Sequence, residues 1–178
     1  MRSTLIRSTA QRMFFAALFA LTAPVYAGSL SVSIEVPRLQ VSEYHRPYVA
    51  LWIARENHQV VTDLSVWYDT ALRNNEGEKW LKDMRQWWRR SGRNHTMPID
   101  GVSGATRAPG VHQLVFKAGE APLGNLEPGD YVLNIEAARE VGGRDLVQIP
   151  FEWSAENSER VYKASGDNEL GNITLRVF

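Results

Sequence analysis

The most constraining feature of the sequence is a series of short strand-like runs that end at turn-forming residues. Residues 30–36 alternate apolar and polar side chains and stop at Pro37, which is typical of a half-buried strand. Residues 48–54 and 60–68, rich in β-branched and aromatic side chains, are joined by the polar segment 55–59 and predict a hairpin. Four more strands are predicted at residues 110–117, 131–139, 146–153 and 173–178. The chain is therefore expected to be mainly β.

One segment, residues 78–90, follows a helical period instead. Its apolar stripe predicts an amphipathic helix and consists of Trp80, Leu81, Met84, Trp87 and Trp88. Such a stripe usually packs on a core, so the three tryptophans are expected to seal one side or end of the fold; the alternative is a platform for a planar ligand. The polar residues 154–172 predict a long loop. The predicted fold is an immunoglobulin-like β-sandwich with one amphipathic helix.

The first 27 residues have the three parts of an export signal. Three arginines precede the apolar run 13–23, and small residues at Val25 and Ala27 fit a cleavage site. An N-terminal membrane anchor is the alternative, but the run is shorter than the roughly 20 residues that span a bilayer. We expect cleavage after Ala27, which leaves residues 28–178 as a single periplasmic domain that does not span the membrane.

Composition excludes several classes of function. Loss of three arginines with the signal leaves 17 basic residues against 20 acidic ones, so nucleic acid is not an expected partner. The absence of cysteine excludes thiol-based metal and redox chemistry. The four histidines lack metal-ligand spacing, so no metal site is predicted. Any redox function requires a cofactor.

One segment carries recognisable chemistry: Asp100-Gly101-Val102-Ser103-Gly104-Ala105-Thr106. It resembles the flavinylation motif Asp-x-x-Ser/Thr-Gly-Ala-Thr/Ser of exported electron carriers, including flavin-carrying subunits of the sodium-pumping NADH:quinone oxidoreductase. In that motif an FAD:protein FMN transferase attaches FMN by a phosphoester to the last hydroxyl. The resemblance implies Thr106 as the acceptor and covalent FMN as the cofactor.

The residue types suit a substrate loop. Gly104 and Ala105 leave little bulk to keep the backbone out of another enzyme's active site. A Thr hydroxyl is a weak nucleophile, and the segment supplies neither base nor metal, so the transferase must bring them. Asp100 would either bind the transferase or brace the loop. Arg107 adjoins the expected phosphoester and would offset its charge.

A wider resemblance covers most of the chain and is carried by residues 46–52, 79–81, 103–106 and 136–140. These segments look like an uncharacterised family of predicted periplasmic proteins with a domain-of-unknown-function label. Its second half is similar to immunoglobulin-like modules. Members tend to be associated with FMN transferases and with PepSY-type membrane proteins. This implies an electron-transfer setting, with a PepSY-type reductase as a partner.

The leading hypothesis is a periplasmic electron-transfer flavoprotein, a carrier more than a stand-alone enzyme, with FMN on Thr106 and its ring on Trp80, Trp87 or Trp88. The alternative is a non-enzymatic immunoglobulin-like binding or assembly module. His95 and His112, near Thr106, are minor candidates for flavin or partner contacts. Arg139 and Glu140, followed by two glycines, are expected to form an ion pair at a hairpin turn. Arg139 is also in phase with inward-facing residues, and an inward arginine would need a buried carboxylate or an anionic ligand.

The export signal gives a direct prediction. Protein recovered from the periplasm should begin at Gly28, because Ala27 ends the predicted cleavage site. Intact-mass measurement or N-terminal sequencing checks this. Retention of Met1 in the inner membrane fraction would instead indicate the anchor.

Overall fold

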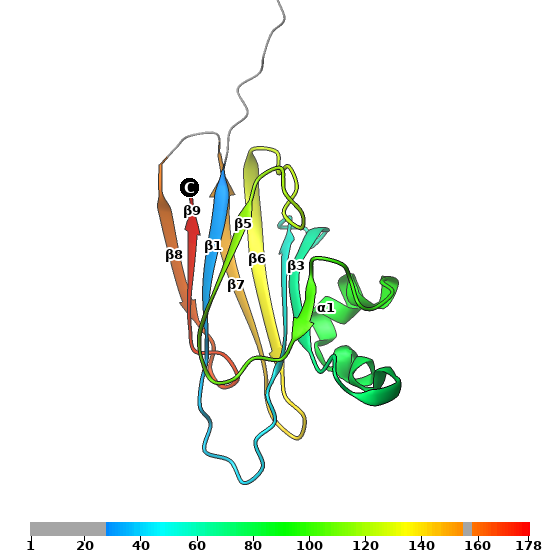
Figure 1. The fold of residues 1–178 in the computed structure, drawn as a ribbon. Helices are drawn as coiled ribbons and strands as arrows, with labels where there is room; N and C mark the ends of the chain where they lie inside the picture. Colours follow the sequence, from blue (N-terminus) through cyan, green and yellow to red (C-terminus); the bar gives the residue numbers. More distant parts are fainter. Residues whose placement is uncertain (1–27, 155–157) are drawn as a thin grey trace, which may run out of the picture.

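The computed structural model describes residues 28–154 and 158–178, which form two β-sheets packed face to face (Figure 1). The predicted signal, residues 1–27, lies outside the described residues. One sheet has the order β5-β1-β9-β8 and comprises β1 (Ser29–Val36), β5 (Gly110–Lys117), β8 (Arg160–Ser165) and β9 (Asn172–Val177). The other has the order β4-β3-β2-β6-β7 and comprises β2 (Tyr48–Ala54), β3 (Val60–Tyr68), β4 (Ser103–Ala105), β6 (Gly129–Ala138) and β7 (Arg144–Trp153).

The mainly β, sandwich-like architecture is confirmed. Each strand predicted from the sequence is present within two residues of its expected bounds, and β2 and β3 form the expected antiparallel hairpin. Immunoglobulin topology is not confirmed. In an immunoglobulin domain the first two strands share a sheet, whereas β1 and β2 lie in different sheets here.

The main core lies between the two sheets. Alternate residues of β6 point into it, and Tyr131, Leu133, Ile135 and Ala137 are at most 1% exposed. A second apolar cluster covers the outer face of the five-stranded sheet and includes Ala50, Trp52, Val66, Tyr68, Leu81, Met84 and Trp87. The five-stranded sheet is therefore buried on both faces over much of its area.

Three short helices cover that outer face: η1 (Arg73–Asp83), α1 (Arg85–Arg90) and η2 (Gly92–Asn94) (Figure 1). The prediction of one continuous helix over residues 78–90 is wrong, because the chain breaks at Met84, whose ψ of 72° is not helical. The carboxylate of Glu136 accepts the N–H groups of Gln86 (2.9 Å) and Trp87 (2.8 Å), so a new helix begins there. Of the predicted apolar stripe, Leu81, Met84 and Trp87 are nevertheless fully buried, whereas Trp80 is exposed.

The prediction of a loop over residues 154–172 is also wrong in part, because residues 160–165 form the edge strand β8, paired antiparallel with β9. Alternate residues of β8 are exposed, so its polarity reflects an edge position and not the absence of a strand. Residues 155–157 lie outside the described part of the chain.

A buried carboxylate shapes the turn between β8 and β9. Oδ2 of Asp145, on β7, accepts four backbone N–H bonds of 2.9–3.1 Å from residues 167–170. Burial raises the pKa of Asp145, but the four N–H donors outweigh it and leave that pKa below its ordinary value. The ionised carboxylate therefore stabilises the fold.

Asp145→Ala should lower the free energy of unfolding by about 3 kcal/mol at neutral pH, since it leaves buried N–H groups without an acceptor. A carboxylate whose folded pKa is depressed stabilises the protein above its unfolded pKa and stops doing so as pH falls through the folded pKa. The difference from wild type should therefore shrink below about pH 4. Urea unfolding across pH measures this.

Asp167→Ala is the matched control, because Asp167 is exposed in the same turn. It should change stability by less than about 0.5 kcal/mol. A loss for Asp145→Ala that is the same at pH 3 and pH 7 would rule out the ionised carboxylate as its cause.

Candidate functional site

The predicted attachment segment, residues 100–106, forms a turn followed by the edge strand β4. Ser103–Ala105 pairs in parallel with Val66, Trp67 and Tyr68 of β3. The N–H of Thr106 extends this pairing by donating to the carbonyl of Tyr68 (3.1 Å). The expectation that the whole segment is a polar loop is corrected: its second half belongs to the sheet.

Ser103 closes the turn that precedes β4. Its N–H donates to the carbonyl of Ile99 (2.9 Å), and its hydroxyl accepts the N–H of Ile99 (2.9 Å). Val102, between them, is buried against the five-stranded sheet. The Ser103 hydroxyl therefore has a structural role within the motif.

Asp100, Gly101 and Gly104 make few side-chain contacts within the fold. Asp100 is exposed and makes no hydrogen bond or ion pair with any described residue, so it does not brace the turn. Gly101 has φ of 67°, which favours glycine. At Gly104, a Cβ would come no closer than 4.0 Å to its nearest neighbour, Trp67. Asp100 and Gly104 are thus available for a role outside the fold.

Thr106 lines a cavity of about 430 Å³ at the end of the five-stranded sheet where β3, β4 and β6 end and β2 begins. Its lining includes the aromatic side chains of Tyr44 and Tyr48, at the start of β2, and of Trp80, in η1. Thr106 is partly exposed, and its hydroxyl has no hydrogen-bond partner among the described residues. The volume lies within the range of small-molecule sites.

The three tryptophans differ in position. Trp80 is 41% exposed and lines the cavity with Thr106. Trp87 is fully buried, and its indole N–H donates to Asp63 (2.9 Å). Trp88 packs against Trp87, with ring centroids 6.2 Å apart, and does not line the cavity. Trp80 is therefore the one of the three that shares a cavity with Thr106.

A second hollow of about 560 Å³ adjoins the first, and both are lined by Trp80, Asp83, Ala138, Arg139 and Glu140. It is completed by Arg85 and by the β6–β7 turn with the start of β7, residues 141–144. Trp80 thus stands where two connected depressions meet, with surface available on both sides.

Charged groups surround the first cavity. The side chain of Arg139 is buried and donates to Glu169 (2.9 Å) instead of pairing with Glu140, so the predicted ion pair at the hairpin turn is wrong, and the alternative of an inward arginine with a buried carboxylate is confirmed. His45 lies 3.7 Å from Glu140 at the rim. Arg46 is exposed and makes no ion pair with any described residue. Burial, with Glu169 close by, raises the pKa of Tyr44 above its ordinary value.

Arg107 does not line this cavity. Its guanidinium stacks over Trp67, 4.3 Å from the ring centroid. His112 packs edge-on against the same ring, 5.7 Å away, and its Nε2 donates to the carbonyl of Ala108 (2.7 Å). Burial lowers the pKa of Arg107. The two residues close the side of the sandwich between edge strands β4 and β5.

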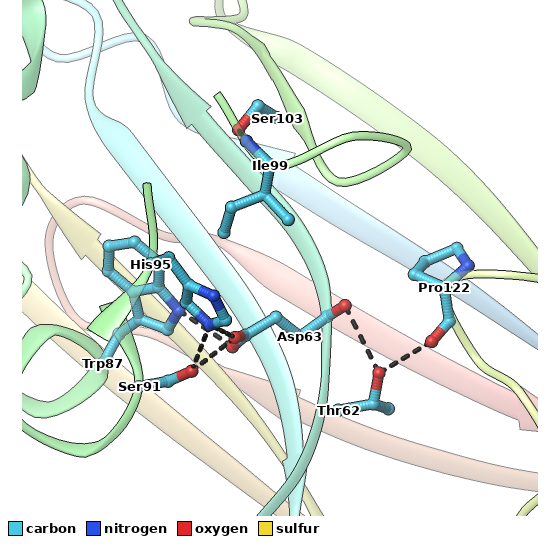
Figure 2. A network of polar contacts seen from close by, with 8 residues as sticks. All are labelled: Thr62, Asp63, Trp87, Ser91, His95, Ile99, Ser103 and Pro122. Carbon is cyan, nitrogen blue, oxygen red and sulfur yellow. Dashed lines mark hydrogen bonds and ion pairs between the residues drawn. The ribbon is translucent and has the colours of Figure 1, made fainter. Parts of the chain in front are cut away.

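His95 belongs to a polar cluster beneath the helices (Figure 2). Its Nε2 lies 2.9 Å from Asp63 Oδ2 and 3.0 Å from the hydroxyl of Ser91, which itself donates to Asp63. In a catalytic triad the acid and the nucleophile contact opposite ring nitrogens. Here they share one nitrogen, and Ser91 and Asp63 are buried. The cluster therefore fastens the helices to β3.

Taken together, these features define a β-sandwich protein with a half-open cavity beside a helical layer. The chain belongs to the family described as predicted periplasmic protein (DUF2271), whose model matches residues 29–172. The match confirms the family resemblance and agrees with the expected periplasmic location. No curated protein and no solved structure matches the chain.

Two classes of feature are not found in the described part of the chain. None of its helices is long and apolar enough to cross a membrane. Across residues 28–154 and 158–178, no group of three His, Cys, Asp or Glu side chains is placed to hold a metal ion.

The geometry separates structural from non-structural motif residues. Ser103→Ala should lower the free energy of unfolding by about 1–2 kcal/mol, because it leaves the N–H of Ile99 without its acceptor. Asp100→Ala and Gly104→Ala should change it by less than about 0.5 kcal/mol. Urea unfolding of the three variants tests this. A loss at Gly104 as large as at Ser103 would reveal packing that the structure does not contain.

Proposed function

We propose that the protein is a periplasmic electron-transfer flavoprotein that carries FMN covalently on Thr106. The observation that supports this most is the position of Thr106: it directly follows the edge strand β4 and lines a cavity with Trp80, and its hydroxyl has no partner among the described residues. A motif residue that served only the fold would be expected to resemble Ser103, whose hydroxyl is engaged.

The cavity residues fit the chemical parts of FMN. Trp80, Tyr44 and Tyr48 offer aromatic surface to a planar ring system. Arg46, without an ion pair among the described residues, is available to a phosphate held on Thr106. Arg139 supports the same region, although Glu169 already neutralises its charge.

Thr106 is the acceptor of the proposed modification and not its catalyst. Its oxygen would form a bond to the FMN phosphorus of FAD, the bond from that phosphorus to AMP would break, and AMP would leave. No side chain of the described chain accepts a hydrogen bond from the Thr106 hydroxyl. The base that takes its proton, and any metal, must therefore belong to the FAD:protein FMN transferase.

Bound FMN would supply the electron-transfer chemistry, and the chain would hold it in place and set its surroundings. The covalent bond would keep the cofactor from being lost in the periplasm. The half-exposed Trp80 leaves one side of the cavity open to a redox partner. A PepSY-type membrane reductase is the proposed donor or acceptor on the membrane side.

Thr106→Val tests the proposal, because Val has nearly the shape of Thr but no hydroxyl. Co-expressed with an FMN transferase and exported, wild-type protein should gain the mass of one FMN less one water and stay yellow after denaturation. Thr106→Val should be colourless and folded. Thr106→Ser should still be labelled. Intact mass, visible absorbance and circular dichroism measure these outcomes.

Ser103→Ala is the control for the second motif hydroxyl, and peptide mapping places the FMN. Label on Ser103 would move the acceptor there. Wild-type protein that stays colourless beside a labelled control substrate would refute the proposal. The alternative, a non-enzymatic immunoglobulin-like binding or assembly module, would then take its place.

A further inference from the structure

The helical layer is rich in basic residues. Residues 79–93 contain six Lys and Arg residues and one acidic residue, Asp83. We call the five exposed cations of this segment the basic layer: Lys79, Lys82, Arg85, Arg89 and Arg93. The helices that bear them project from the outer face of the five-stranded sheet (Figure 1).

Most of this charge is not neutralised within the protein. Lys79 pairs with Glu76 (3.1 Å), and Arg89 donates to the neutral side chain of Gln86 (2.7 Å). Lys82, Arg85 and Arg93 make no ion pair with any described residue. The buried carboxylate of Glu136, beneath the layer, is already occupied by Arg144 (2.7 Å).

The layer contrasts with the rest of the chain. After removal of residues 1–27, acidic residues outnumber basic ones by three over the whole chain, although residues 79–93 have a surplus of five positive charges. The molecule is therefore electrically polarised, with its positive end at the helices. A polarised molecule is steered so that this end meets an anionic partner first.

We propose that the basic layer is the docking surface for an electron-transfer protein with an acidic surface around its redox centre. The layer borders both hollows, since Trp80 and Asp83 line the two and Arg85 lines the second. Docking there would bring a partner's redox centre next to Trp80. The redox identity of the partner rests on the proposed function, whereas the surface and its charge preference do not.

The geometry favours an acidic protein over an anionic membrane. Membrane-bound basic helices insert protruding apolar side chains between the lipids. The large exposed apolar residues here, Leu72 and Trp80, instead line the concave cavity. Brief protein encounters in electron transfer, by contrast, need only a small charged contact.

The test uses flavin-free exported protein, made without a transferase, and the acidic haem domain of cytochrome b5 as the probe. Lys82→Glu with Arg89→Glu reverses two exposed charges that line neither hollow. Lys117→Glu with Lys163→Glu, on the other sheet, makes the same change in net charge. Binding is measured at low and at physiological ionic strength.

Wild-type protein should bind the haem domain at low salt and less tightly at physiological salt. The helix-layer double variant should bind about tenfold more weakly, because two attractions become repulsions, and the control pair should stay within about twofold of wild type. Equal weakening by both pairs would show that net charge alone matters and would overturn the proposal. So would undetectable binding of wild-type protein.

Vesicles of phosphatidylcholine and phosphatidylglycerol in equal amounts test whether the basic layer binds an anionic membrane instead of a protein. If they bind the protein through Lys82 and Arg89 while the haem domain does not bind, the surface is a membrane site and the proposal is wrong. Because the assay needs no flavin, its result does not depend on whether the proposed function is right. Colourless protein in the labelling experiment refutes the flavoprotein, and unselective binding here refutes the docking surface.

Discussion

The buried carboxylate of Glu136 is the interaction on which the helical layer and the cavity depend. It is fully buried on β6, accepts the N–H groups that begin α1 at Gln86 and Trp87, and pairs with Arg144. Arg144 is partly exposed, but the carboxylate of Glu136 is not, so removing its partners would leave a buried charge uncompensated and this position tolerates little change. By fixing where α1 begins, Glu136 also fixes the end of η1, and with it the position of Trp80 beside Thr106.

How far the sequence predicts the fold depends on where the determining contacts lie. Residues 131–137 alternate along one strand, so their pattern alone predicts β6 and its inward face. Residues 103–105 have no such pattern, because β4 is held by backbone pairing to a strand some forty positions earlier in the chain. The helix break at Met84 depends on Glu136, about fifty residues later, so an unbroken apolar stripe predicts a continuous helix that the structure divides.

The candidate site, too, is only partly predictable from the sequence. The motif and the export signal single out Thr106 from the sequence, and the tryptophan stripe includes Trp80. That these two share a cavity, and that Trp87 is instead fully buried, depends on tertiary contacts. The sequence does not single out Tyr44 and Arg46 as site residues, because no chemical motif or periodic pattern includes them. The signals that could have suggested them are the strongly β segment that begins at Tyr48 and, for Arg46, the segment 46–52 that carries the family resemblance.

Under the proposed function, the edge strand resolves two opposing requirements on the acceptor residue. The hydroxyl must reach the active site of another enzyme, yet the attached group must afterwards be held by this protein. β4 pairs with a single neighbour, Ala105 is exposed, and Gly104 leaves the backbone uncovered, so the segment is approachable from outside. Thr106, one residue beyond the strand, lines the cavity without any change in the conformation of this approachable segment. A transferase could therefore work on the folded domain, and the opening that admits it would leave the bound flavin within reach of a partner at the helical layer.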